Sequence, residues 1–236
     1  MFPGGPVREY LAVSKMIDHS LLNPTLTVSD LEAGCELAVR YDVASVCILP
    51  YYVRRCAELL KGSTVVASTT IGFPHGAHTT ATKLAEARTA IADGARELDM
   101  VVNISKVLSG DLAYVRDEIR QICELAHAAN SKVKVIFEKC YLNNDQKIAL
   151  CKICTDIKAD WVKTSTGYGT GGFTFEDISL MLAHVGPGVQ VKAAGGVRDL
   201  DTLLKLKEMG VTRSGATRTA TMLDEMKKRL GMAAAQ

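Results

Sequence analysis

The stretch that decides the fold runs from residue 79 to residue 102 and reads TTATKLAEARTAIADGARELDMVV. Its first part, 79–93, has the apolar spacing of an amphipathic helix. Gly94 follows, and glycine is the residue type that most often ends a helix because it adopts a left-handed backbone without steric cost. The run 96–102 comes next, and its apolar residues Leu98, Met100, Val101 and Val102 predict a strand. The stretch therefore predicts a helix joined to a strand by a short turn that contains a glycine.

This alternation of helix and strand continues in both directions along the chain. Short apolar or β-branched runs predict strands at 15–19, 44–49, 64–71, 96–102, 132–138, 160–164, 189–193 and 211–214. Segments with helical spacing lie near 29–41, 51–60, 79–93, 111–129, 144–158, 175–185, 199–209 and 216–230. For the helix at 29–41 we expect Ser29 as the N-cap and Glu32 as its capping-box partner. Residues 103–110 predict a loop or short helix.

Alternating strands and helices indicate parallel strands joined by right-handed crossovers. Eight such units favour a closed (β/α)8 TIM barrel, in the α/β class, over an open doubly wound sheet. A barrel of this kind commonly fills about 250 residues, and this chain has 236. No linker-like or low-complexity stretch interrupts it, so we expect residues 1–236 to form one catalytic barrel domain.

Composition excludes several classes of partner. The chain has 28 basic and 26 acidic residues, a net charge of +2, which gives no reason to expect nucleic acid or a membrane surface as a partner. Seven cysteines form no disulfide-like framework and indicate a reducing compartment. No secretory signal is present and no apolar run approaches the about 20 residues that span a bilayer. We therefore expect a cytoplasmic protein that acts on a small molecule.

Lysines stand near the ends of two successive predicted strands, at Lys163 and Lys192, and Lys134 lies on the strand before them. The active site of such a barrel is at the carboxyl ends of its strands. Neighbouring strands are about 4.8 Å apart, so two inward lysines repel each other. Repulsion and burial both lower a lysine pKa, and a neutral amine can attack a carbonyl. The alternative is that these lysines point outward between helices or neutralise a phosphate.

Carbon–carbon cleavage through an imine also needs a group that moves protons. Asp99 lies between a leucine and a methionine in the fourth predicted strand, where a carboxylate is costly to bury without a cationic partner. Lys134, Lys163 and Lys192 offer such partners. Asp18, at the end of the first predicted strand, is a second candidate.

Glycines cluster after the last three predicted strands. They are Gly167, Gly169, Gly171, Gly172, Gly195, Gly196 and Gly215. Such turns let backbone N–H groups approach an anion, and phosphate sites at this position are frequent in barrels. Arg198 and Thr217 would add a charge and a hydroxyl. The alternative is that the glycines only form tight turns between strands and helices.

A metal site has weaker support in the sequence. His75 and His78 lie in one loop without a clear third ligand, so we expect His75 to shape the loop or contact substrate. Cys151 and Cys154 form a C-x-x-C pair, but within a predicted helix, which favours a packing role.

Eight short runs, taken in order, resemble those of the deoxyribose-phosphate aldolases, class I aldolases with a TIM-barrel fold. The runs are IDHSLL (17–22), SVCILP (45–50), IGFPHG (71–76), ELDMV (97–101), KVIFE (134–138), KTSTG (163–167), KAAGGVR (192–198) and SGAT (214–217). They span nearly the whole chain, and their order and spacing are specific although several are weak alone.

The resemblance implies reversible cleavage of 2-deoxy-D-ribose 5-phosphate to D-glyceraldehyde 3-phosphate and acetaldehyde. It implies that Lys163 forms the Schiff base and that Asp99 and Lys192 transfer protons, in an order that stays open. Asp18 and Lys134 would support the hydroxyl and charge network, and Cys47 would line the pocket. The other substrate-binding residues would be Thr166, Gly172, Gly195, Gly196, Gly215 and Thr217. The family needs no metal or organic cofactor, and the resemblance implies a homodimer or homotetramer.

The chain departs from the family pattern in three places. Arg218 stands where a small hydroxyl residue is common, and Lys139 stands where threonine is more usual, so that an added cation could shift nearby pKa values. Some members end in a tyrosine that reaches the site, whereas this sequence ends MAAAQ. Two alternatives stay open: a barrel that binds a phosphosugar without catalysis, which only Lys139 and Arg218 encourage, and a transaldolase-like enzyme for another phosphosugar.

Overall fold

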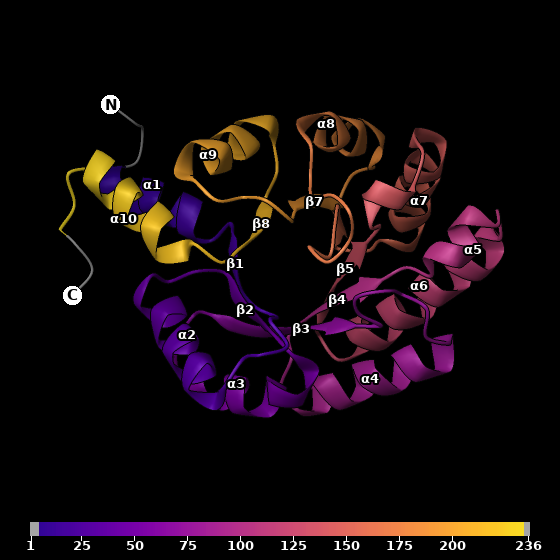
Figure 1. The fold of residues 1–236 in the computed structure, drawn as a ribbon, viewed down its shortest axis with the longest axis horizontal. Coiled ribbons are helices and arrows are strands. Elements are labelled where there is room, and N and C mark those ends of the chain that lie inside the picture. Colours follow the sequence, from indigo (N-terminus) through magenta and orange to yellow (C-terminus); the bar gives the residue numbers. More distant parts are fainter. Residues whose placement is uncertain (1–4, 234–236) are drawn as a thin grey trace.

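The computed structural model of the chain describes residues 5–233, and its eight parallel strands form a closed barrel (Figure 1). The strands pair in chain order, and β1 closes the barrel against β8. They are β1 (Ile17–Leu21), β2 (Ser45–Ile48), β3 (Val66–Ile71), β4 (Glu97–Val101), β5 (Lys132–Ile136), β6 (Trp161–Lys163), β7 (Gln190–Ala193) and β8 (Arg213–Ala216). The predicted (β/α)8 TIM barrel is confirmed.

Helices surround the barrel as an outer layer (Figure 1). They are α1 (Gly5–Ser14), α2 (Val28–Arg40), α3 (Val53–Leu59), α4 (Thr80–Ala92), α5 (Ile104–Leu108), α6 (Leu112–Ala128), α7 (Asn144–Ile157), α8 (Phe175–His184), α9 (Leu200–Met209) and α10 (Thr219–Arg229), with 3-10 turns η1 (Pro50–Tyr52) and η2 (Lys139–Tyr141). Helix α5 is the short helix expected after the fourth strand. Helix α1 was not predicted; it packs beside α9 and α10 and buries Tyr10 and Val13.

Helix boundaries follow the local capping chemistry. Gly94 follows α4 with a φ of +105°, as its position after the helix predicted. The prediction for α2 was wrong, because the helix begins earlier than Ser29. The hydroxyl of Thr27 accepts a hydrogen bond from the Asp30 N–H at 3.2 Å, and the Asp30 carboxylate accepts one from the Thr27 N–H at 2.9 Å. This reciprocal cap satisfies two free donors at the helix start, and Ser29 is left in the exposed first turn.

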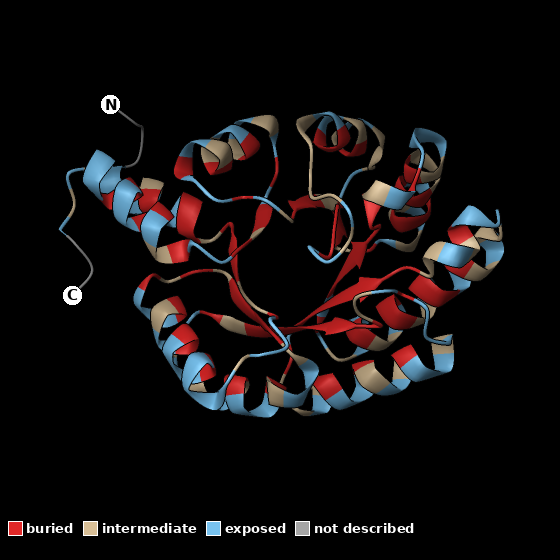
Figure 2. Ribbon diagram, viewed as in Figure 1, coloured by how far each residue is buried: buried red, intermediate tan, exposed pale blue. Residues whose placement is uncertain are grey.

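The two faces of the strands carry different chemistry. Side chains alternate across a strand, so Leu98 and Met100 of β4 join the apolar core beneath the helices while Asp99 faces the barrel interior. Buried residues follow the strands around the whole ring (Figure 2). The barrel interior is therefore buried and yet charged, which is the feature that positions the site.

Candidate active site

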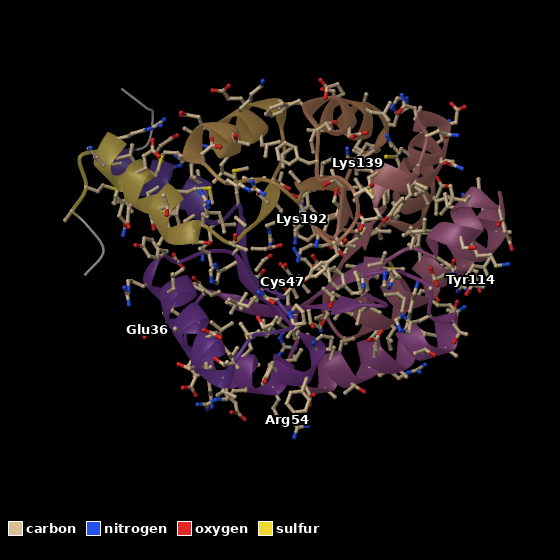
Figure 3. All side chains as sticks on the ribbon, viewed as in Figure 1. Glu36, Cys47, Arg54, Tyr114, Lys139 and Lys192 are labelled. Carbon is tan, nitrogen blue, oxygen red and sulfur yellow. The ribbon has the colours of Figure 1, made fainter. Side chains whose placement is uncertain are left out.

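Strand pairing places the two predicted lysines side by side. Lys163 of β6 is in register with Lys192 of β7, and both side chains are buried. Each Nζ donates to Oδ2 of Asp99, at 2.7 Å from Lys163 and 2.7 Å from Lys192. Both lysines thus point inward, against the alternative that they lie between helices. Figure 3 shows Lys192 and Cys47 inside the ring of strands, with Glu36, Arg54 and Tyr114 on the periphery.

Asp99 accepts hydrogen bonds from three lysines. Its Oδ1 accepts from Lys134 Nζ at 2.8 Å, and its Oδ2 accepts from the lysines of β6 and β7. Burial alone would raise the pKa of the Asp99 carboxyl, but the three positive charges outweigh burial and hold the pKa far below its usual range. Asp99 is therefore an anion at neutral pH, in contact with both lysines at once.

The two lysines differ in how easily they lose a proton. Burial lowers the pKa of Lys163; the Asp99 carboxylate opposes this shift and the charge of Lys192 adds to it, so the net direction is downward. Burial also lowers the pKa of Lys192, but the carboxylates of Asp18 and Asp99 together raise it above its usual value. Lys163 is thus the amine that is more easily neutral, and Lys192 is the one that stays charged.

A second group of charges lies below this pair. Asp18 Oδ1 accepts from Arg213 at 2.6 Å and from the Ser45 hydroxyl at 2.7 Å. Glu97 Oε2 lies 2.5 Å from Lys134 Nζ and 2.8 Å from the Arg213 guanidinium. Sequence reasoning did not single out Glu97 or Arg213. Glu97 stands two residues before Asp99 and shares its face of the strand, a signal that could have found it; no comparable signal marked Arg213.

A cavity of about 500 Å³ opens above the charged interior, at the carboxyl ends of the strands. Lys163 reaches it from the barrel, and loops after β1, β6, β7 and β8 form its walls. The walls are lined by seven residues predicted for the site or for its phosphate end: Thr166, Gly167, Gly195, Gly196, Arg198, Gly215 and Thr217. The geometry can hold a small polar molecule with one end over the amine of Lys163 and the other in the glycine loops.

Six residues that the resemblance assigned to the site do not line this cavity. Asp18, Cys47, Asp99, Lys134 and Lys192 are buried in the barrel beneath it. Burial and the charge of Asp99 raise the pKa of the Cys47 thiol, so the group is a neutral packing element and no reactive thiolate. Gly172 lies behind the wall: a Cβ added there would meet the Gly195 carbonyl oxygen at 1.6 Å. Gly172 therefore lets two loops approach closely.

The loop after β6 is tied across the cavity by polar contacts. The Thr166 N–H and hydroxyl both donate to the Glu138 carboxylate, the N–H at 3.1 Å. The Tyr168 hydroxyl donates to the Leu22 carbonyl at 2.6 Å, and its ring packs edge-on against Phe73. The Thr166 hydroxyl also accepts a hydrogen bond from the Tyr168 N–H at 2.9 Å. Thr166 is thus held in place by Glu138 on one side and by the backbone of Tyr168 on the other.

Two of the three departures from the family pattern, Lys139 and Arg218, lie away from the paired lysines; the third, the sequence end MAAAQ, lies outside the described residues from residue 234 on. Lys139 Nζ is 2.7 Å from Asp177 of α8, which also binds Lys147 at 2.7 Å, so its charge is neutralised outside the barrel interior (Figure 3). Arg218 is exposed at the start of α10, next to Thr217. The added cation at Lys139 therefore has no contact with Lys163 or Asp99, and it gives no support to a barrel without catalysis.

The candidate metal ligands are dispersed or buried. His75 and His78 are exposed in their loop, and within residues 5–233 no group of three or more His, Cys, Asp and Glu side chains is placed to hold a metal ion. Cys151 and Cys154 are buried in α7, where burial raises the pKa of the Cys151 thiol to about 12. Both thus pack in the core, as the helical spacing predicted.

Within residues 5–233, the helices are too short or too polar to cross a bilayer.

Comparison with known proteins places these features in a family. Residues 12–233 match the model of the DeoC/LacD family aldolases. The deoxyribose-phosphate aldolase of Rhodopirellula baltica is 65% identical over 226 residues, which cover 96% of this chain and 94% of that protein. An aldolase named QR15 superposes with a TM-score of 0.87 at 34% identity, covering 92% of this chain and 96% of its own. The deoxyribose phosphate aldolase of Aeropyrum pernix, described as a unique tetramer, superposes at 0.85 with 27% identity over 97% of this chain and 100% of its own.

Proposed function

Because this chain belongs to the DeoC/LacD family of aldolases, we propose that it cleaves 2-deoxy-D-ribose 5-phosphate through a Schiff base on Lys163. The products are D-glyceraldehyde 3-phosphate and acetaldehyde, and the reaction is reversible. The observation that carries this proposal is the pair of buried lysines sharing one Asp99 oxygen, with the more easily neutral amine beneath the cavity. A neutral amine is the form of lysine that attacks a carbonyl to form an imine.

The proposed reaction proceeds in four steps. The Lys163 amine adds to the aldehyde carbon of the open-chain sugar, and loss of water gives an iminium ion. A base then takes the proton of the hydroxyl on the third sugar carbon, and the bond between the second and third carbons breaks. Its electron pair moves into the iminium group and forms an enamine, while the phosphorylated aldehyde leaves. Protonation of the enamine and hydrolysis release acetaldehyde and restore the amine.

We assign the proton transfers to Asp99 and Lys192 as one coupled unit. Their contact of 2.7 Å, together with the equal contact from Lys163 to the same oxygen, supports a proton passing between the three groups. Asp18 accepts a hydrogen bond from Lys192, and Lys134 donates one to Asp99, so these two residues keep the proton-transferring pair in place. Cys47 packs beside them. Because interacting groups titrate together, the pair has shared pKa values rather than one for each residue.

The substrate phosphate is proposed to bind in the loops after β7 and β8. Gly195 and Gly196 have φ values of +79° and +119°, and successive residues with unusual backbone angles can turn neighbouring N–H groups toward one anion. Gly215 and Thr217 complete the wall, and exposed Arg198 adds a positive charge at the rim. A phosphosugar is therefore the small-molecule partner that we infer, with no metal or organic cofactor.

Trapping with acetaldehyde and borohydride tests the Schiff base. Reduction of the imine should leave an ethyl group on Lys163, which peptide mass spectrometry would locate. The exposed lysines of the same chain, such as Lys152, report unselective alkylation, so Lys163 should be modified far faster than they are. An ethyl group at Lys192 instead of Lys163 would exchange the roles of the two lysines, and modification of neither would refute the imine mechanism.

Alanine at Gly172 tests the phosphate loops. Its Cβ would collide with the Gly195 carbonyl, so the loop after β7 must move, and kcat/KM for the phosphosugar should fall on the order of 10²-fold. Imine trapping with acetaldehyde, which has no phosphate, should be retained. Gly171→Ala is the matched control, because its added Cβ has its nearest neighbour at 3.6 Å. Equal kinetics for the two variants would place the phosphate elsewhere.

We also infer a homo-oligomer, either a dimer or a tetramer, since the Aeropyrum pernix relative is described as tetrameric. The single continuous core supports one catalytic domain. Sedimentation velocity of the purified chain would establish the number of subunits, and a monomer at micromolar concentration would contradict the inference.

A further inference from the structure

Arg213 and Glu97 form a buried ion pair below the paired lysines. The two guanidinium nitrogens of Arg213 donate to the two carboxylate oxygens of Glu97, at 2.8 and 3.0 Å. The Arg213 side chain also lies over the Trp161 ring, 4.7 Å from its centre. Only 9% of Arg213 and 6% of Glu97 is exposed. A two-pronged contact stacked on an aromatic ring holds the guanidinium in one orientation.

Each member of this pair also contacts a residue next to the reacting lysines. Arg213 donates to Asp18 Oδ1 at 2.6 Å, and the other oxygen of Asp18 accepts from Lys192. Glu97 lies 2.5 Å from Lys134, which donates to Asp99. One chain of contacts thus leads from Arg213 through Asp18 to Lys192. A second leads from Glu97 through Lys134 to Asp99.

The charges of this buried group do not cancel if all of them are ionised. There are four cations and three carboxylates, an excess of one positive charge: the cations are Lys134, Lys163, Lys192 and Arg213, and the carboxylates are Asp18, Glu97 and Asp99. Lys134 contacts three of these carboxylates, and Lys192 and Arg213 contact two each. Lys163 contacts Asp99 alone, and it shares that oxygen with Lys192. Excess buried charge is costly, and it is relieved when the least compensated cation loses its proton.

We propose that Arg213 and Glu97 are positioning residues of the aldolase site. Their opposite charges belong to the buried group of four cations and three carboxylates, in which Lys163 is the surplus cation. They also fix Asp18 and Lys134 and so orient Lys192 and Asp99. This inference rests on the proposed Schiff base at Lys163. Neither residue touches the cavity, so both act through the groups between them and the substrate.

The charged and titratable groups around the three residues define what a substitution changes. Lys163 faces Asp99 from β4, Lys192 from β7 and Cys47 from β2. Arg213 faces Asp18 from β1, Glu97 from β4, Lys134 from β5 and Trp161 from β6. Glu97 is also in register with Lys132 of β5, whose side chain is exposed and lies over the Trp161 ring. No histidine is among these neighbours, so the acidic limb of the rate profile reports the lysines and carboxylates.

The experiment compares pH profiles for imine trapping at Lys163 and for kcat/KM in four full-length variants. Glu97→Gln removes a negative charge, so the pKa of Lys163 falls and the acidic limb should move to lower pH. Arg213→Gln removes a positive charge, so the limb should move to higher pH. Each shift should be on the order of 1 pH unit, the size expected for a unit charge several ångströms away in a partly polar interior.

Two further variants separate charge from shape. The double variant Glu97→Gln with Arg213→Gln removes one charge of each sign, so its limb should return close to that of the unmodified protein. Arg213→Lys keeps the charge but loses the two-pronged contact, so its limb should stay in place while kcat falls with little change in KM. A merely structural pair would not produce shifts of opposite sign that cancel in combination.

Distinct outcomes identify which idea fails. If the unmodified protein forms no adduct on Lys163, the proposed function fails before the pair is tested. If the adduct forms but the limbs of Glu97→Gln and Arg213→Gln stay unmoved or move in the same direction, the positioning role is overturned. If Arg213→Gln does not fold, comparison of Glu97→Gln with the double variant still tests the positioning role. Only that role predicts that the acidic limb moves to lower pH in Glu97→Gln and returns in the double variant.

Discussion

Replacement of Lys163 by methionine is expected to lower kcat/KM for deoxyribose 5-phosphate by at least about 10⁴-fold, the scale on which removal of a nucleophile acts. Methionine has nearly the length of lysine but no amine, so no imine can form. The remaining buried cations then match the three carboxylates of the barrel interior. We therefore expect the variant to unfold at the same temperature as the unmodified protein or a higher one, because the surplus charge is gone.

A coupled assay for glyceraldehyde 3-phosphate measures the loss, and thermal unfolding followed by circular dichroism measures the stability. Lys152→Met is the matched control, because Lys152 is an exposed lysine of α7 and its substitution should change neither quantity. Activity within about 100-fold of the unmodified protein would mean that catalysis does not depend on an imine at Lys163.

Asp99→Asn is expected to have the second-largest effect, on activity and stability together. The amide keeps the shape of the carboxylate, but three lysine ammonium groups lose the anion that they share. Breaking a buried ion pair on one side costs about 3–5 kcal/mol of stability. Loss of the proton-transferring group should lower kcat about 10²–10⁴-fold. Since the missing negative charge also favours the neutral form of Lys163, imine trapping with acetaldehyde should survive better than turnover.

Urea unfolding gives the stability, and the ratio of turnover to trapping separates proton transfer from imine formation. Asp156→Asn is the control, since Asp156 is exposed and pairs with Arg116 on the surface; its effect should stay within about 0.5 kcal/mol. An Asp99→Asn enzyme that turned over normally would show that the proton transfers run through Lys192 without this carboxylate.

Several features of the fold could be predicted because they depend on neighbours in the sequence. The helix 79–93, Gly94 and the strand 96–102 were found from spacing and residue type alone, and the structure differs from the predicted ends by only one residue. Start positions were less predictable where two caps compete: Thr27 with Asp30 and Ser29 with Glu32 have similar patterns. Which one caps α2 depends on where the preceding chain leaves the barrel, and the spacing of the residues does not contain that information.

The residues of the candidate site also fall into those that the sequence could predict and those that it could not. Lys163 and Lys192 could be found because each stands near the end of its strand, and Asp99 because a carboxylate in an apolar strand needs a partner. Arg213 could not be found, since its importance comes from Asp18 and Glu97, which are 195 and 116 residues away in the chain. The sequence also suggested that Lys139 could disturb the site, whereas the structure pairs this lysine with Asp177.

The amino-acid sequence by itself determined the alternation of strands and helices, the closed barrel and the strands that carry the lysines. These features follow from the periodicity of apolar residues and the positions of glycines, which depend only on neighbours in the sequence. Only the tertiary structure decided which lysine more easily loses its proton. That outcome depends on the register of Lys163 with Lys192 and on three buried carboxylates brought together from β1 and β4. Electrostatic energy follows distance in space, and barrel closure sets those distances.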